Sequence, residues 1–258
     1  PTYAGLGRLQ SNGAFDANDL GMLYLISIPM ALLLSYNSGP VGTWIARFVL
    51  LGAPAGMAMT GSRGAMVGLA ICAPVLFVSM KRVPIWKRMG IVAALLAALA
   101  VAAPAGYWEQ MQTIMQPEDD YNVADEYGRV GIAKRGVGYM LQYPVFGVGL
   151  ANFPRAEGTI SPIAVERMSQ GEAVRWIAPH NTYVQVGAEL GVVAIGIWLS
   201  LLAYGTIGLW LLWRRIPPSW AHESPERRFL RDSCQFLPVS LLGFAVTTFF
   251  LSHGYTTP

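Results

Sequence analysis

The chain has 258 residues, of which 53% are hydrophobic and only 13% are charged, and its mean hydropathy is +0.41. Soluble globular domains carry nearly twice this charged fraction, about 25%, so the composition argues against a soluble enzyme. The formal net charge of +3 is weak support for nucleic-acid binding, because the basic residues gather beside apolar segments, as is typical of membrane-span flanks. The two cysteines, Cys72 and Cys234, lie at apolar stretches without the spacing of metal ligands.

Six apolar stretches are long enough to cross a bilayer, which takes about 20 mostly apolar residues. None alternates polar and apolar residues as a barrel strand does, so we predict helices. The fold class is therefore all-α: a polytopic membrane helical bundle of about six spans. The run from Asp16 to Asp19 before the first span resembles a helix start, with Asn18 or Asp19 as the cap. The predicted spans are residues 20–36, 41–60, 64–80, 90–106, about 191–213, and 236–252.

Basic residues in two loops predict the orientation of the chain. Loop 81–88 has four basic residues and no acid, and loop 214–232 has five arginines against three acids. Two crossings separate these loops, so both are expected on the cytoplasmic side. The turn 61–63 and the long segment 107–179 then face outward. The predicted organisation is membrane spans one to four in 1–106, an extracytoplasmic loop domain in 107–179, and spans five and six in 180–258.

The large extracytoplasmic loop carries structure of its own. After an acidic turn at 117–120, apolar residues recur every three or four positions over 126–143, which predicts a helix. Pro144 ends this helix, and a glycine-rich turn follows at 146–153. A structureless loop of this length would be unusual. We therefore expect a folded, functional cap that contains one helix.

Two arginines in the outward-facing segments could carry chemistry. Arg63 lies in a tight turn between two spans, where an interfacial anchor and a functional role are about equally expected. Arg129 lies near the start of the loop helix, a position that more often belongs to a solvated face. Together the two side chains could form a forked donor site for a phosphate or pyrophosphate.

His180 and Glu189 lie where the loop re-enters the membrane. A histidine there suits a general base near neutral pH, although a capping role at a helix start fits the sequence equally well. Glu189 is the only acid in its apolar stretch, which indicates either a functional carboxylate or a buried ion pair with an arginine. The sequence has no phosphate loop, zinc-type histidine pair, nucleophile elbow or metal-binding cysteine pair, so we predict no metal and no cofactor.

Several motifs, taken in order, resemble the O-antigen ligase and O-antigen polymerase superfamily of bacterial envelope glycosyltransferases. The resemblance covers about residues 16–213. Members usually have more than six spans, so we expect this chain to be a fragment that lacks N-terminal helices. The motifs are Asp16-Ala17-Asn18-Asp19-Leu20, Thr60-Gly61-Ser62-Arg63-Gly64, Gly128-Arg129, the run 143–153, and the run 179–185 with Glu189-Leu190-Gly191.

The resemblance implies transfer of a glycan from an undecaprenyl-pyrophosphate carrier to an acceptor hydroxyl. It places this reaction at the outer face of the bacterial inner membrane, without metal. The implied partners are a lipid-linked oligosaccharide donor, membrane lipid, and a glycan, lipid A-core or protein acceptor, with no nucleic acid. Aliphatic residues follow Arg129 where an aromatic residue is frequent in the family, which keeps Arg135 as its alternative. The implied catalytic residues are His180, Arg63 and Arg129, and the substrate-binding candidates are Arg135, Asn181 and Glu189.

A pyrophosphate is a good leaving group, so the arginines would stabilise developing negative charge while His180 accepts the proton of the hydroxyl. The hypothesis is an inverting displacement. A polymerase or protein O-oligosaccharyltransferase of the same superfamily is an alternative, because no residue identifies the acceptor. A transporter or flippase subunit is the alternative from another class, and it is expected to have an inverted repeat or charged residues within its spans. The sequence shows no repeat and few charges inside the predicted spans. A structural anchor with a sensory loop would leave the arginines and histidine unexplained.

Overall fold

The structure is a computed structural model that describes residue 9 and residues 15–80, 83–104, 106–112, 114 and 125–252. Within these ranges the chain is helical and forms no strand, which confirms the predicted all-α class. Five of the described helices are long and apolar enough to cross a membrane, and a sixth apolar helix is shorter, with 17 residues. The acidic turn 117–120 and two basic residues of the predicted loop 81–88, Lys81 and Arg82, lie outside the described residues.

The chain divides into two compact units. The first consists of residues 1–112 and 202–247, and the second of residues 113–201 and 248–258. The sequence-based division separated the outer loop from the helix that follows it, whereas here the first half of that helix packs with the loop. The predicted boundaries refer to the membrane rather than to packing, and they stay a prediction.

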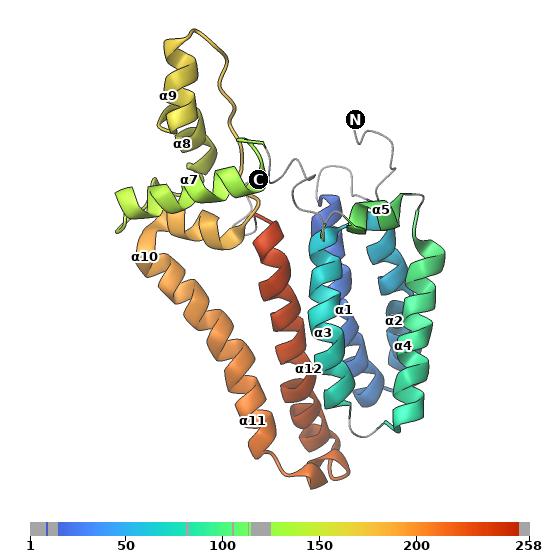
Figure 1. Cartoon of the computed structure of the whole chain (residues 1–258). Helices are drawn as coiled ribbons and strands as arrows, with labels where there is room; N and C mark the ends of the chain where they lie inside the picture. The colour runs from blue at the N-terminus through green and yellow to red at the C-terminus, as the bar shows by residue number, and fades with distance from the viewer. Residues whose placement is uncertain are drawn as a thin grey trace. The chain divides into compact units, whose positions relative to one another are not determined.

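The first unit is a bundle built around α1, which packs on α2, α3 and α12 (Figure 1). Leu25 and Ile28 of α1 lie in its apolar core with Met57 and Phe236. Outward-facing apolar side chains such as Phe48, 80% exposed, suit contact with lipid. The described helices of this unit are α1 (Ala17–Asn37), α2 (Pro40–Thr60), α3 (Arg63–Ser79), α4 (Ile85–Ala102), α5 (Tyr107–Gln112), η2 (Tyr204–Gly208), α11 (Leu209–Arg215), η3 (Pro218–Ala221) and α12 (Pro225–Thr247).

Helix α1 begins three residues before the predicted span. The Asp16 carboxylate accepts hydrogen bonds from the backbone N–H groups of Asn18, at 2.6 Å, and Asp19, at 2.8 Å. The Asp19 carboxylate in turn accepts from the Asp16 N–H at 2.9 Å, which completes a capping box. The prediction that Asn18 or Asp19 caps this helix was therefore wrong, because the carboxylate that bonds the first turn belongs to Asp16.

Two hydrogen bonds define one end of the first unit. The Gln235 amide of α12 donates to the backbone oxygen of Ser79, the last residue of α3, at 3.0 Å. The Asn37 amide, at the end of α1, donates to the Asp232 carboxylate of α12 at 3.2 Å. The two segments predicted to be cytoplasmic therefore begin or end at the same end of this bundle, as their charge pattern requires.

The second unit is formed by the outer loop and the first part of α10. Its described helices are α7 (Arg129–Gln142), α8 (Phe153–Thr159), α9 (Pro162–Ser169), α10 (Thr182–Ala203) as far as residue 201, and η4 (Thr248–Phe250). Helix α7 confirms the helix predicted over 126–143. Its Ile132 and Tyr139 share an apolar core with Phe153 of α8 and with Val184 and Ala188 of α10. The cap therefore has a core of its own.

Candidate functional site

The turn that carries Arg63 is held by tight packing in the first unit. Helix α2 ends at Thr60 and is capped by Gly61, whose φ of 59° is a left-handed conformation that favours glycine. Ser62 then caps α3 by accepting from the Ala65 N–H at 3.3 Å. The Gln110 amide of α5 donates to the Gly61 oxygen at 3.1 Å. These contacts leave Arg63 half-exposed as the first residue of α3.

Arg63 and Arg129 occupy equivalent positions, because each is the first residue of its helix. A cation there is unfavourable toward the helix dipole by roughly 0.3–1 kcal/mol. The same position, beside backbone N–H groups that point outward, is suited to a bound anion. The placement is therefore costly for helix stability and favourable for phosphate binding. Gly128, the N-cap of α7, contributes no side-chain cap.

Arg135 has a structural partner that its sequence did not reveal. Its guanidinium forms an ion pair with Glu157 of α8, with a distance of 2.6 Å between Nη2 and Oε2. The Glu157 side chain is only 2% exposed, and it also accepts a hydrogen bond from the Tyr139 hydroxyl at 2.8 Å. Burial, and next the neighbouring Glu157 carboxylate, raise the pKa of Tyr139 well above its usual range. The role of Arg135 in substrate binding stays a prediction, as does the choice between Arg129 and Arg135 as the functional loop arginine.

His180 lies directly before α10 in an unusual backbone conformation. Its φ is 47°, a left-handed value that costs a residue other than glycine roughly 1–3 kcal/mol. Asn181 caps the helix, since its side-chain oxygen accepts from the N–H groups of Tyr183, at 3.0 Å, and Val184, at 3.1 Å. The buried Thr182 hydroxyl donates to the Leu251 oxygen at 2.8 Å. His180 is thus exposed on a fixed backbone, and substrate binding by Asn181 stays a prediction.

Helices α7 and α10 pack side by side and run in the same direction. Gly136 of α7 lies against the side chain of Val184, and Met140, one turn later, lies against Gly187, also about one turn later on α10. A Cβ at Gly136 would overlap the branched Val184 side chain, so the close approach there favours glycine, whereas the flexible end of Met140 could move away from a Cβ at Gly187. The N-terminal ends of α7 and α10 therefore lie at the same end of the pair (Figure 1).

The segments that lead into Arg129 and His180 are also in contact. The Arg175 guanidinium lies over the ring of Tyr127, with 4.7 Å between Cζ and the ring centroid, and the Arg167 guanidinium lies over it at 5.4 Å. Such cation–π contacts are worth about 0.5–1 kcal/mol when exposed. Tyr127 precedes Arg129 by two residues, and Arg175 precedes His180 by five. The structure thus brings the starts of α7 and α10 together, whereas Arg63 belongs to the other unit.

Helix α10 breaks at Gly191, whose φ of 81° and ψ of −174° are not helical. A side chain there would collide with the backbone oxygen of Val145. The break frees the Val192 N–H from the helix, and this group donates instead to the Pro144 oxygen at 2.7 Å. The predicted span began at residue 191, which is where the second part of α10 begins.

The glycine-rich turn donates hydrogen bonds to backbone carbonyl groups of α10 next to the break at Gly191. The backbone oxygen of Ala188 accepts from the Val148 N–H at 2.8 Å, and that of Glu189 accepts from the Gly149 N–H at 2.9 Å. Gly147, with φ of 61°, lies so close to these two carbonyls that a Cβ could not be accommodated. The turn and the broken helix are therefore one joint, in which each replaces the hydrogen bonds that the other lacks.

Glu189 strengthens the same joint with its side chain. Its carboxylate accepts from the N–H of Phe153, the first residue of α8, at 2.8 Å, and from the N–H of Ala151 at 3.2 Å. These bonds satisfy backbone donors at the start of α8, where the Asn152 side chain makes no cap. The sequence indicated either a functional carboxylate or a buried ion pair with an arginine at Glu189. In the described part of the chain, the carboxylate is bonded to backbone N–H groups instead of an arginine. Substrate binding by Glu189 stays a prediction.

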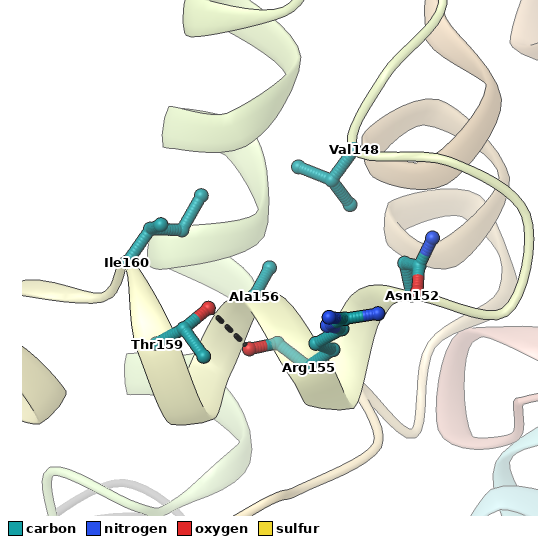
Figure 2. Close-up of a pocket in the computed structure, with 6 residues that line it drawn as sticks. All are labelled: Val148, Asn152, Arg155, Ala156, Thr159 and Ile160. Atoms are coloured by element: carbon teal, nitrogen blue, oxygen red, sulfur yellow. Dashed lines mark hydrogen bonds between the residues drawn. The ribbon is translucent and has the colours of Figure 1, made fainter.

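The joint also borders a cavity of about 270 Å³ in the second unit. Its lining residues come from the turn, from α8 and from the residue that follows α8, as Figure 2 shows. Among the described residues, no group of three or more His, Cys, Asp or Glu side chains could hold a metal ion. The cavity is lined by Val148, Asn152, Arg155, Ala156, Thr159 and Ile160.

A family model described as O-antigen ligase matches residues 48–199, more than half of the chain. The chain belongs to the O-antigen ligase family. A search among curated proteins finds no match. The O-antigen ligase match confirms the resemblance drawn from the motifs, and it includes all six predicted site residues. This O-antigen ligase family member is thus a multi-pass membrane protein with a function of the ligase or polymerase type.

Sequence reasoning missed two residues of the second unit. Glu157 is the partner of Arg135, but their separation of 22 residues matches no local pattern. Arg155 lines the cavity, and no role was predicted for it from the sequence. Its position two residues after the start of α8, behind the glycine-rich turn, was the signal that could have drawn attention to it.

Proposed function

We propose that this chain transfers a glycan from an undecaprenyl-pyrophosphate carrier to an acceptor hydroxyl at the periplasmic face of the bacterial inner membrane. The observation that carries the proposal is the placement of His180. It is exposed in a left-handed backbone, directly before a capped helix, and at the same end of the α7–α10 pair as Arg129. Backbone strain at an exposed histidine supports a functional assignment, and the family supports this reaction class.

In the proposed step, the acceptor hydroxyl oxygen attacks the anomeric carbon of the donor sugar. The bond from this carbon to the pyrophosphate oxygen breaks, and its electron pair stays on the pyrophosphate. Neutral His180 accepts the hydroxyl proton as general base. Attack opposite the leaving group inverts the anomeric configuration.

Arg129 is assigned to the departing diphosphate. Its guanidinium can donate two parallel hydrogen bonds to a phosphate, and the N-terminus of α7 adds backbone donors. Arg63 is proposed as a phosphate-binding position of the first unit, because it also opens a helix. Fixed positive charge of this kind stabilises the negative charge that develops as the bond breaks, so the proposed mechanism needs no metal.

The test uses the full-length product of the gene in membranes, supplied with a lipid-linked glycan donor. His180→Ala is compared with His222→Ala, which removes an exposed histidine of the first unit. Because a general base contributes about 10²–10⁴-fold, we expect His180→Ala to lose at least a hundredfold in transfer rate at equal expression. His222→Ala keeps full activity. Undiminished transfer by His180→Ala would contradict the proposal, and product size separates a ligase from a polymerase.

A further inference from the structure

The cavity beside the glycine-rich turn has the dimensions of a small ligand site. Its volume of about 270 Å³ lies near the lower limit of ligand pockets, roughly 300–1,000 Å³. Such a volume suits one sugar ring rather than an extended glycan. All of its lining residues fall within the second unit and within the described part of the chain.

Two polar side chains at this cavity have no protein partner among the described residues. Arg155 is exposed, and Figure 2 shows its guanidinium extending toward the Asn152 amide. By contrast, Arg135 and Arg167 of the same unit are paired with glutamates. An arginine and an amide that face one cavity together provide several hydrogen-bond donors for a ligand.

The remaining walls of the cavity are mostly apolar. Val148, Ala156 and Ile160 contribute them, and the Thr159 hydroxyl is already bonded to the backbone oxygen of Arg155 at 2.7 Å. The polar donors are therefore concentrated at the Arg155 side. A matching ligand has an anionic group at one end and a ring with an apolar face at the other. A sugar ring that bears an acidic group has this character.

The carboxylates of Glu157, which belongs to α8, and Glu189, which bonds N–H groups at the start of this helix, do not oppose an anion in the cavity. Glu157 is paired with Arg135, and Glu189 is 1% exposed and bonded to backbone N–H groups. Neither lines the cavity. Because Glu189 already occupies the backbone donors at the start of α8, the site depends on the Arg155 side chain rather than on the helix end.

The cavity wall is also preformed. The N–H of Val148 is bonded to α10, and the N–H of Asn152 is bonded to the Gly149 oxygen at 3.2 Å. A ligand therefore does not have to order this backbone on binding, which lowers the entropic cost of association.

We propose that this cavity is a subsite for an acidic sugar residue, whose carboxylate or phosphate group is bound by the Arg155 guanidinium. Asn152 donates to a neighbouring ring hydroxyl. The assignment of this sugar to a transferred or accepting glycan rests on the proposed function, but the binding itself does not. Carboxylate and phosphate share the bidentate geometry that a guanidinium recognises.

The test measures sugar binding to the purified full-length gene product in nanodiscs by calorimetry. The ligands are methyl glucuronide, glucose 6-phosphate and methyl glucoside, which present a carboxylate, a phosphate and no charge. We expect at least one acidic sugar to bind more tightly than methyl glucoside, and Arg155→Ala to weaken it by about tenfold or more. Lys134→Ala, which removes an exposed cation of the same unit that does not line the cavity, leaves binding unchanged.

The two acidic ligands distinguish a uronate from a sugar phosphate. Equal binding of all three sugars, no binding of any, or acidic-sugar binding that persists in Arg155→Ala would each overturn the proposal. His180→Ala separates it from the proposed function, because this variant is expected to lose transfer and keep sugar binding. If the unmutated protein binds no acidic sugar but its transfer activity still depends on His180, only the subsite is ruled out. If acidic-sugar binding depends on Arg155 but His180→Ala keeps full transfer activity, only the proposed mechanism is ruled out.

Discussion

At the scale of single residues, the two arginines of α7 differ in what surrounds them. Arg135 is 12% exposed and shares a carboxylate with the Tyr139 hydroxyl, so it belongs to a buried polar network. Arg129 is half-exposed at the start of the helix. A buried ion pair stabilises little by itself, but the loss of one partner leaves the other charge buried and uncompensated. The two arginines should therefore respond differently to substitution.

We expect Arg135→Ala to lower the free energy of unfolding by about 3–5 kcal/mol, because Glu157 is left without its cation. Arg129→Ala changes this free energy by about 1 kcal/mol or less and instead lowers glycan transfer. Chemical unfolding in detergent, paired with the transfer assay, measures both effects. Replacing Arg135 and Glu157 together by Met and Gln should restore much of the stability. Equal destabilisation by the two single substitutions would contradict this division of roles.

The residue scale also shows what local sequence can predict. Arg63, Arg129 and His180 were placed at helix starts because turns and apolar periodicity mark these boundaries along the chain. The pairing of Arg135 with Glu157 could not be predicted, because it depends on how α8 folds back onto α7. The exposed cavity at Arg155 depends on the same folding, so no spacing rule reveals it.

At the scale of elements, the joint between the glycine-rich turn and α10 holds the second unit together. Its two parts are some 40 residues apart, and both contain glycines with positive φ, Gly147 and Gly191. The freed backbone groups of one part bond those of the other. This exchange explains why glycine is required at each position, and it fixes the turn that borders the cavity.

Two glycines of α10 give a matched comparison of this requirement. Gly191→Ala is expected to destabilise the protein by at least about 1–3 kcal/mol, because alanine must adopt positive φ and would overlap the Val145 oxygen. Gly196, in the same helix, has open space within 4 Å of the point where a Cβ would lie. Gly196→Ala should therefore be neutral or stabilise by about 0.5–1 kcal/mol. Thermal unfolding of both variants measures the difference, and a neutral Gly191→Ala would remove the joint as a structural constraint.

The predicted spans match the helix bounds of the structure where polarity changes abruptly along the sequence, and they differ from these bounds elsewhere. The apolar stretches were predicted as helices because lipid leaves few alternatives. Helix α12 begins at Pro225, eleven residues before its predicted span, since a helix can continue into water with its charged first turns. Helix α10 begins at Thr182 for a related reason, because its first turns pack on α7 rather than in lipid.

At the scale of the whole molecule, the distribution of charge predicts which face meets the cytoplasm. Ser79, which precedes one basic segment in the sequence, and Asp232, which ends the other, lie at one end of the first unit, where hydrogen bonds join α3 and α1 to α12. Basic loops are retained on the cytoplasmic side during insertion. Arg63, at the other end of α3, and the entire second unit as far as His180 are then expected in the periplasm.

Single cysteines test this orientation directly. Cys72 and Cys234 are both buried, so Cys72→Ala and Cys234→Ala provide a background without accessible thiols. Into this background we place Lys134→Cys or His222→Cys, each at an exposed position. Because one predicted span, 191–213, separates the two positions, we expect them on opposite faces. A membrane-impermeant maleimide should label Lys134→Cys in intact spheroplasts, and His222→Cys only after lysis. The reverse pattern would show the opposite orientation, with His180 on the side away from a periplasmic acceptor. Labelling of both cysteines in intact spheroplasts would show that residues 191–213 do not cross the membrane.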